Sequence, residues 1–398
     1  MISITRLWCG AGFEGDALRY GEKNHHNAFK VEKSAATRRP IVVWNCTRRC
    51  NLSCVHCYSS SKDKHYPDEM STGQGKMLVD QLADFNVPVL LFSGGEPLIR
   101  EDIFTIADYA REKGIRPVIS TNGTLITEAK AKALKKSGFA YVGISLDGIG
   151  DVNDRFRGKK GAFREALKGF RACTSIGLKV GLRFVLTQRN VDDIDRILDF
   201  IDEEGVNRAC FYHLVPSGRG ENMKGDLLTP EVAQKAIYKV MDRAMDFHKR
   251  GKTKDILTVD NHCDGVAIYL RLKKENPEKA EKVLSLLEWN GGGAFSTGVG
   301  IGCVDWFGNV HPDQFWRDQI LGNVRNRSFG DIWMDRSNPL MDGLKDRLHL
   351  LKGKCGSCRF KKACGGSLRV RAQKINGDPW SSDPGCYISD EDCGWSGE

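Results

Sequence analysis

The stretch NCTRRCNLSCVHCYSSS, residues 45–61, follows a short apolar run and places four cysteines within twelve positions. Three of them, Cys50, Cys54 and Cys57, have the spacing C-x3-C-x2-C. Three thiolates on one tight loop can bind three irons of a four-iron cube and leave the fourth iron open to another ligand. Thiolates also bind zinc, but a structural zinc site is normally closed by four ligands. The triplet therefore favours an iron–sulfur cluster, with zinc as the alternative.

The fourth cysteine of the stretch is Cys46. We interpret Cys46 as a small buried residue, with a functional thiol near the cluster as the alternative.

Length, charge and cysteine content narrow the class of protein. A chain of 398 residues fits one large domain or two moderate ones. Its 14 cysteines gather mainly in two places of a long chain with regular helix and strand patterns, which indicates metal binding in the cytoplasm and disfavours a secreted disulfide scaffold. No apolar run reaches about 18 residues and no cleavage-site pattern follows the start, so we expect neither a membrane span nor a signal peptide. The net charge of +9 is spread along the chain, which favours an anionic small substrate or partner over a nucleic acid.

Short apolar runs alternate with helical patterns over the first half of the chain. Six strands are predicted, at 39–46, 88–95, 116–123, 140–148, 179–187 and 208–216. Helices are predicted between them, at 72–86, 103–114, 127–138, 161–177 and 192–205. This alternation predicts the α/β class, with a parallel sheet in a partial (β/α)6 TIM-like barrel. Barrel enzymes carry their sites on the loops at the carboxyl ends of the strands, where the cysteine triplet lies.

We expect four segments along the chain. An N-terminal extension covers 1–38 and the partial barrel covers 39–220. Residues 221–290 form a mostly helical connecting region, and residues 291–398, richer in Gly, Trp and Cys, form a distinct C-terminal unit.

The triplet at the end of the first predicted strand resembles the cysteine loop of the radical S-adenosylmethionine (SAM) superfamily. The resemblance implies that SAM binds the open iron, and that one electron cleaves it to methionine and a 5′-deoxyadenosyl radical. It also implies SAM contacts at the strand ends: His56 near the adenine, Gly94, Gly95 and Glu96 at the amino group, Ser145 and Asp147 at the ribose, and Arg183 at the carboxylate. Glycines let the backbone approach closely, and a carboxylate pairs with an ammonium. Polar strand ends without a ligand are the alternative for Ser145 and Asp147, and a solvated or core-paired arginine is the alternative for Arg183.

A second group of cysteines lies near the C-terminus. Cys355, Cys358 and Cys364 have the spacing C-x2-C-x5-C, and Cys386 follows at a distance. Four thiolates close a site, and the spacing alone leaves a structural zinc as the alternative. The pattern resembles the SPASM extension of radical SAM enzymes, which implies an auxiliary [4Fe-4S] cluster held by these four residues.

The chain departs from the full SPASM pattern, which carries two auxiliary clusters. Asp313 and Leu368 occupy positions where that pattern has cysteines, so we predict one auxiliary cluster, two [4Fe-4S] clusters in all, and a structural role for Cys303. The other cysteines are interpreted as packing residues: Cys9, Cys173, Cys210, Cys263 and Cys393.

Longer segments resemble the radical SAM enzymes that process siroheme-derived tetrapyrroles. These segments include NGGGAFSTGVGIG, GNVHPDQFWRDQILGNVR and CRFKKACGGSLRVRA, and the resemblance covers roughly residues 40–390. The N-terminal part is closer to the heme-pathway branch, which removes two acetate side chains of 12,18-didecarboxysiroheme and yields iron-coproporphyrin III. The alternatives are propionate removal from the same substrate in heme d1 biosynthesis, propionate decarboxylation to vinyl groups, a peptide-modifying SPASM enzyme, and a non-enzymatic zinc or cluster scaffold.

Substrate contacts and partners follow from that chemistry. The carboxylates of a tetrapyrrole need cations, and Arg317, Arg369 and Arg371 are candidates, with surface arginines as the alternative. His262 and His311 are candidates for an axial ligand of the substrate iron. The family implies a flavodoxin- or ferredoxin-type electron donor, and we expect no nucleic acid and no membrane among the partners.

Overall fold

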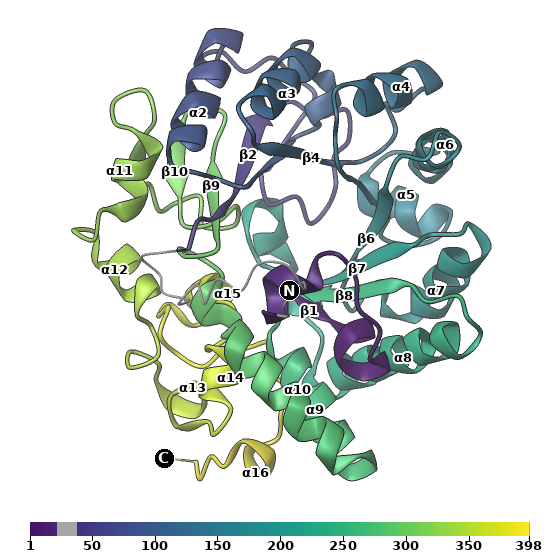
Figure 1. Ribbon diagram of the computed structural model, residues 1–398, viewed down its shortest axis with the longest axis vertical. Helices are drawn as coiled ribbons and strands as arrows, with labels where there is room; N and C mark the ends of the chain where they lie inside the picture. The colour runs from purple at the N-terminus through teal and green to yellow at the C-terminus, as the bar shows by residue number, and fades with distance from the viewer. Residues whose placement is uncertain (22–37, 398) are drawn as a thin grey trace.

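The computed structural model describes residues 1–21 and 38–397, so residues 22–37 of the expected N-terminal extension lie outside the described part. Its centre is one sheet of 11 strands in the order β1-β8-β7-β6-β5-β4-β3-β2-β9-β10-β11. The sheet curves into an open, partial barrel around which the helices are arranged (Figure 1).

Seven of the eight neighbouring parallel strands of this sheet come from the first 259 residues of the chain. They are β2 (Ile41–Thr47), β3 (Val89–Gly94), β4 (Arg116–Thr121), β5 (Val142–Ser145), β6 (Val180–Leu186), β7 (Arg208–His213) and β8 (Asp255–Val259). The six predicted strands are confirmed as β2 to β7. Strand β8 was not predicted: it lies in the region expected to be mostly helical and adds a seventh parallel strand.

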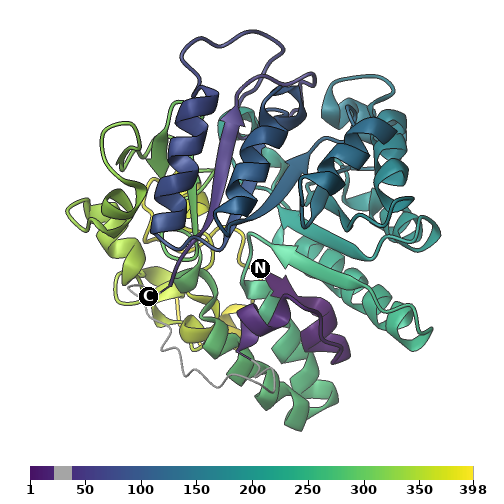
Figure 2. The same ribbon diagram turned by 45° about the horizontal axis from the view of Figure 1, so that its top comes forward.

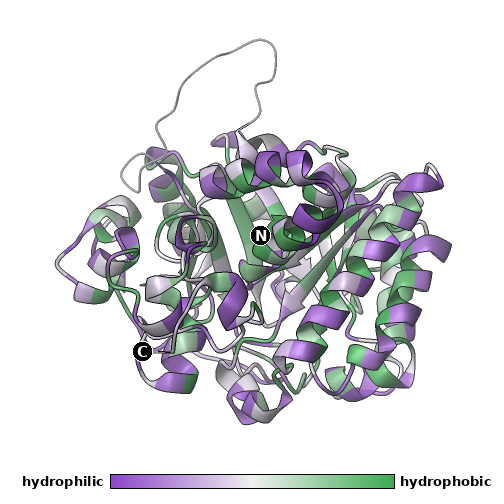
Figure 3. Cartoon of the chain, turned by 90° about the horizontal axis from the view of Figure 1, so that it is seen from below, coloured by the Kyte–Doolittle hydropathy of each residue, from purple (hydrophilic) through white to green (hydrophobic). Residues whose placement is uncertain are grey.

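Helices cover the outer side of the sheet. The predicted helices are confirmed as α2 (Thr72–Asp84), α3 (Ile103–Glu112), α4 (Glu128–Lys136), α6 (Ala162–Thr174) and α7 (Ile194–Glu203). A short additional helix, α5 (Asp151–Arg157), follows β5. Each long helix turns an apolar face toward the strands, as in α7, where Ile194, Ile197, Leu198 and Ile201 are buried. Figure 2 shows the helices in front of the strands, and Figure 3 shows hydrophobic strands inside helices with hydrophilic outer faces.

The connecting region and the N-terminal residues pack together on the β8 side of the sheet. Helices α8 (Pro230–Lys249), α9 (Cys263–Glu275) and α10 (Pro277–Asn290) follow β7 and β8. The described N-terminal residues form β1 (Ile2–Ser3), the π-helical turn η1 (Thr5–Cys9) and α1 (Asp16–Tyr20), and β1 pairs antiparallel with β8. None of the described helices is long and apolar enough to cross a membrane.

The C-terminal unit is joined to the barrel through the sheet. Strand β9 (Ile301–Val304) pairs parallel with β2, and β10 (Asn309–His311) and β11 (Gly322–Asn323) continue antiparallel. Six short helices follow: α11 (Phe329–Met334), α12 (Pro339–Lys345), α13 (Gly353–Ser357), α14 (Lys361–Cys364), α15 (Arg369–Asn376) and α16 (Asp390–Cys393). The pairing of β9 with β2 joins the C-terminal unit, which carries the second cysteine group, to the strand that precedes the first cysteine group.

Candidate active site

The first cysteine group lies on the loop that leaves the carboxyl end of β2. Cys50 and Cys54 are buried and Cys57 is partly buried, and the three pack together with Leu52 and Ala162. Residues 50–57 form neither a helix nor a strand, so all three thiols belong to one short irregular segment. The structure thus brings together the three residues that the spacing grouped.

Each of the three sulfurs has a hydrogen-bond donor nearby. The backbone N–H of Leu52 donates to Cys50 Sγ at 3.4 Å, and Arg157 Nη1 donates to Cys54 Sγ at 3.7 Å. The Ser59 hydroxyl lies 3.2 Å from Cys57 Sγ. Burial raises the pKa of the Cys50 thiol to about 12, so this thiol is neutral when free and metal binding must displace its proton. Three convergent sulfurs with donors fit the thiolates of an iron–sulfur cluster.

The helix α5 holds this loop from one side. The N–H of Ser53 donates to the carbonyl of Arg157 at 3.1 Å, and the Arg157 guanidinium forms an ion pair with Asp147 at 2.6 Å. Both side chains of this pair are at most 8% exposed. Gly158 ends the helix with φ +65°, and a Cβ there would lie 2.8 Å from the Ser53 carbonyl oxygen, so glycine permits this close packing.

Both carboxylate oxygens of Asp147 contact other groups of the protein. Its Oδ1 accepts a hydrogen bond from the N–H of Val185 at 3.0 Å, and its Oδ2 faces Arg157 and, at 3.3 Å, Nε2 of His56. The structure therefore favours a structural role for Asp147 over the ribose contact expected from the sequence. Burial lowers the pKa of His56, whose ring packs edge-on against Phe156 with centroids 5.7 Å apart.

The SGGEP turn is fastened to the same loop. The N–H groups of Gly95 and Glu96 donate to the carbonyls of Thr47 and Arg49, at 2.7 and 2.9 Å. A Cβ on Gly94 or Gly95 would lie 2.3 or 2.1 Å from those two carbonyl oxygens. The glycines are thus required for packing against the cysteine loop, which the sequence did not reveal.

Glu96 is a buried carboxylate at the centre of the strand ends. It accepts hydrogen bonds from the N–H of Leu98 at 3.0 Å, the Thr121 hydroxyl at 2.8 Å and the N–H of Asn122 at 2.8 Å. Burial nevertheless raises the pKa of Glu96 above its usual value. A carboxylate has about four acceptor positions, so one remains for an ammonium group, which would also stabilise the buried charge.

Arg183 and Ser145 lie side by side in the register of β6 and β5. The Arg183 guanidinium donates to the Ser120 hydroxyl and lies 5.4 Å from the Tyr212 ring centroid. Within the described residues it forms no ion pair with a carboxylate. The SAM contacts expected of both residues stay predictions, and the Arg183 guanidinium is able to pair with an added carboxylate.

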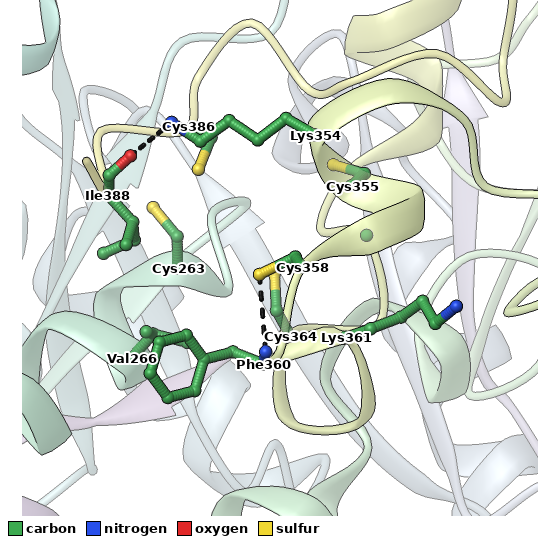
Figure 4. Close-up of a pocket in the computed structure, with 11 residues that line it drawn as sticks. Cys263, Val266, Lys354, Cys355, Cys358, Phe360, Lys361, Cys364, Cys386 and Ile388 are labelled. Atoms are coloured by element: carbon green, nitrogen blue, oxygen red, sulfur yellow. Dashed lines mark hydrogen bonds between the residues drawn. The ribbon is translucent and has the colours of Figure 1, made fainter. Parts of the chain in front are cut away.

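The second cysteine group surrounds a pocket in the C-terminal unit. Cys355 and Cys364 lie in α13 and α14, Cys358 follows α13, and Cys386 lies on the loop before α16. The pocket wall also contains Cys263, the first residue of α9 (Figure 4). Sequence spacing could not identify Cys263 because α9 reaches the pocket only in the folded chain.

Two backbone donors serve this second group of sulfurs. The N–H of Asp383 donates to Cys355 Sγ and the N–H of Phe360 donates to Cys358 Sγ, each at 3.4 Å. No three His, Cys, Asp or Glu side chains in residues 1–21 and 38–397 are close enough to hold a single metal ion.

Arg369 and Arg371 stabilise the segments that surround this pocket. Both side chains are fully buried: Arg369 donates to the carbonyls of Gly366, Pro379 and Ser381, and Arg371 forms two hydrogen bonds of 2.7 and 2.8 Å with Asp383. Most of their donors are used within the protein, and Arg369 Nε has no hydrogen-bond partner among the described residues. Their positions correct the expectation of two arginines open to substrate or on the surface.

The two positions that interrupt the full SPASM pattern have structural roles. Asp313 accepts hydrogen bonds from Thr297, Phe315 and Trp316, and Leu368 packs in a small core with Trp316. Cys303 is fully buried on β9, where it accepts a hydrogen bond from Asn45 at 3.4 Å.

Cys46 is also buried, and its thiol donates to the carbonyl of Ser93 at 3.3 Å. Burial raises the pKa of Cys46 to about 12, which fits the packing role expected from the sequence.

The two candidate histidines are buried outside the first cysteine loop. His311 is engaged at both ring nitrogens, with the carbonyl of Gln319 at 2.9 Å and Asp305 at 3.3 Å. His262 lies 3.2 Å from the amino group of Met1 through Nε2. Burial places the pKa of His262 well below its usual value, so the ring is neutral. The engagement of His311 disfavours it as an axial ligand.

Replacing Arg157 with leucine is expected to destabilise the protein by about 3–5 kcal/mol, because the substitution leaves the buried carboxylate of Asp147 without its cation. The free energy of unfolding, measured by urea denaturation, tests this expectation. Arg155→Ala, an exposed position on the same helix, is the matched control and should change stability by less than about 0.5 kcal/mol. Equal effects of the two variants would contradict the role assigned to Arg157.

Replacing Glu96 with glutamine is expected to weaken SAM binding by roughly tenfold to a hundredfold, because the ammonium loses a buried carboxylate. Titration calorimetry with SAM measures the change. Glu101→Gln, an exposed residue close by in the chain, serves as the control. Unchanged SAM affinity in the Glu96 variant would rule out this contact.

Comparisons with known proteins agree with this site. Residues 44–201 match the family model described as "Radical SAM superfamily". The chain is 50% identical to Fe-coproporphyrin III synthase of Methanosarcina barkeri over 398 residues, 99% of each protein. It is 39% identical to pre-heme d1 synthase of Dinoroseobacter shibae, over 90% of this chain and 88% of that protein.

The fold also resembles a solved structure. The structure "Native anSMEcpe with bound AdoMet" aligns with a TM-score of 0.68 and 19% identity, over 87% of this chain and 94% of that chain. This likeness concerns the fold. The sequence identity along the full length shows that the chain belongs to the radical SAM superfamily, in the family that contains Fe-coproporphyrin III synthase and pre-heme d1 synthase.

Proposed function

We propose that this enzyme removes the two acetate side chains of 12,18-didecarboxysiroheme and yields iron-coproporphyrin III in alternative heme biosynthesis. The observation that carries the proposal is the 50% identity with Fe-coproporphyrin III synthase along the whole chain. The three-thiol loop beside Glu96 and Arg183 supplies the site that radical SAM chemistry needs.

Cys50, Cys54 and Cys57 hold a [4Fe-4S] cluster in this proposal. When bound, the cluster and SAM supply a 5′-deoxyadenosyl radical that takes a hydrogen atom from an unactivated carbon. Glu96 holds the SAM ammonium, and Arg183 holds its carboxylate with Ser145 alongside. The donors to each sulfur stabilise the negative charge of the cluster.

Cys355, Cys358, Cys364 and Cys386 hold one auxiliary [4Fe-4S] cluster. The backbone donors to Cys355 and Cys358 and the spread of the thiols around one pocket support this assignment. A flavodoxin- or ferredoxin-type donor would supply the electron that SAM cleavage consumes. The net charge of +9 suits an acidic partner.

Two arginines near the first cysteine loop form a site for a substrate carboxylate. The guanidinium groups of Arg48 and Arg317 lie 5.4 and 4.5 Å from the centroid of the buried Trp306 ring. Neither forms an ion pair with a carboxylate of the described residues. Burial and the nearby Arg48 lower the pKa of Arg317, although the charge of Asp305 acts in the opposite direction.

Both arginines lie close to the first cysteine loop, where a substrate must meet the radical. Arg48 precedes Cys50 by two residues, and Arg317 Nη1 donates to the carbonyl of Tyr58, the neighbour of Cys57, at 3.4 Å. Guanidinium groups bind carboxylates with paired hydrogen bonds. We assign the two arginines to one carboxylate arm of the tetrapyrrole.

Anaerobic turnover tests the proposed reaction. The reconstituted enzyme is mixed with SAM, dithionite and 12,18-didecarboxysiroheme, and the pigment is analysed by mass spectrometry. We expect loss of both acetate arms and formation of iron-coproporphyrin III together with 5′-deoxyadenosine. Loss of propionate mass would assign the enzyme to the heme d1 branch, and an unchanged pigment beside 5′-deoxyadenosine would contradict the tetrapyrrole assignment.

Alanine at Arg48 or Arg317 is expected to weaken binding of iron-coproporphyrin III by roughly tenfold or more, because each substitution removes a charged hydrogen-bond donor. Absorbance titration of the pigment measures the affinity. Arg327→Ala, which removes a half-exposed arginine paired with Asp335 at 2.9 Å, is the control. If all three variants bind the pigment equally, the carboxylate site is wrong.

A further inference from the structure

The guanidinium group of Arg219 spans the first cysteine loop. Its Nε donates a hydrogen bond to the carbonyl of Cys54 at 2.8 Å, and its Nη1 donates to the carbonyl of Ser61 at 2.6 Å. The backbone N–H of Arg219 donates to the carbonyl of Cys57 at 2.9 Å. One residue, 165 positions after Cys54 in the chain, therefore holds the loop at three of its carbonyl groups.

The turn that precedes Arg219 keeps this residue close to the loop. Gly218 has φ +58°, and a Cβ there would lie 2.3 Å from the carbonyl oxygen of Tyr58. Glycine therefore allows the turn to pack directly on the backbone of the cysteine loop. The Ser217 hydroxyl donates to the carbonyl of Phe315 at 2.7 Å, which joins the same turn to the C-terminal unit. The position of the guanidinium is thus fixed by the backbone as well as by its own hydrogen bonds.

The positive charge of Arg219 is not balanced by a carboxylate. Its side-chain partners are carbonyl groups, and within the described residues it forms no ion pair. Its Nη2 is buried and has no hydrogen-bond partner in the described part of the chain. Glu221, the acidic residue nearest in the sequence, pairs instead with Lys374 at 2.9 Å. Because a guanidinium stays protonated in a protein, a full positive charge remains beside the loop.

Arg157 provides the contrast, because its side chain also contacts Cys54. Its Nη1 donates to Cys54 Sγ at 3.7 Å, but its guanidinium forms the 2.6 Å ion pair with Asp147. The charge of Arg157 is therefore balanced inside the protein. Of these two arginines, Arg219 is the one whose charge remains to act on a group bound by the loop.

We propose that Arg219 is a positioning residue that holds the first cysteine loop and, through its unbalanced charge, raises the reduction potential of the cluster bound there. This inference rests on the first cluster of the proposed function and is independent of the substrate. Reduction adds negative charge to a cluster, so a nearby cation stabilises the reduced form more than the oxidised form. A less negative potential makes the cluster easier to reduce by a flavodoxin- or ferredoxin-type donor.

The test compares Arg219→Gln and Arg219→Lys with the unmodified enzyme. Glutamine removes the charge but keeps a donor for a carbonyl, whereas lysine keeps the charge but loses the planar fork of donors. Iron and sulfide are determined in the reconstituted holoenzyme, and the reduction potential is measured by redox titration followed by EPR. The signal that SAM changes in a parallel sample identifies the first cluster and separates it from the auxiliary one. Arg189→Gln, which removes a half-exposed arginine paired with Asp226 at 2.7 Å, is the control.

We expect Arg219→Gln to keep the iron and sulfide content of the unmodified enzyme and to shift the potential of the first cluster to a more negative value. The expected size is a roughly tenfold lower ratio of reduced to oxidised cluster at a fixed potential, which corresponds to about 59 mV. Arg219→Lys, which keeps the charge, should remain close to the unmodified enzyme, and the control should not shift the potential.

Three results would overturn the electrostatic role of Arg219. An unchanged potential in Arg219→Gln would show that the charge has no effect, and equal shifts in the glutamine and lysine variants would show that the charge is not the cause. Loss of the SAM-responsive cluster from Arg219→Gln would show that the residue only holds the loop. An unmodified enzyme without any SAM-responsive signal would refute the first cluster itself, whereas a wrong substrate would show only in the pigment analysis.

Discussion

The buried ion pair between Asp147 and Arg157 is the contact on which the cysteine loop depends. It joins the end of β5 to the end of α5, and the Arg157 guanidinium continues to the Cys54 sulfur. Asp147 also accepts a hydrogen bond from Val185 on β6, so one carboxylate connects two strands, a helix and the loop. A buried charge of this kind is stable only when its partners stay in place. The geometry of the three thiols is therefore set by the barrel and not by the loop alone.

The C-terminal unit depends on an analogous internal pair. Arg371 and Asp383 are both fully buried, and Asp383 also receives the N–H of Leu368 while its own N–H donates to Cys355. The glycine-rich segment after α10 packs against the same region, since a Cβ on Gly292 would lie 2.3 Å from the Cys364 carbonyl oxygen. Strand β9 connects this unit to β2, the strand that precedes the first cysteine loop. The unit that carries the second cysteine group is thus joined to the sheet that carries the first.

Much of this arrangement could be predicted from the sequence because its signals are local. Buried parallel strands appear as apolar runs, and ligands on one loop appear as short cysteine spacings. Strand β8 was missed because its five residues, DILTV, lie between long helical patterns, although Gly251 before it and Asp260-Asn261 after it are turn residues. The partners of Cys263, Asp147 and the buried arginines could not be predicted, since they are distant in the sequence and meet these residues only in the folded chain. The roles of Gly94 and Gly95 were anticipated as close backbone approach, but the backbone that approaches is the protein's own cysteine loop.

The central claim is that the loop after β2 binds a four-iron cluster with one iron left open for SAM. Pulsed EPR of the dithionite-reduced enzyme, with SAM carrying ¹⁵N in its amino group, tests this claim most directly. The account predicts that SAM alters the cluster signal and that a hyperfine coupling to the labelled nitrogen appears. A cluster signal that SAM leaves unchanged, with no coupling to the label, would contradict it.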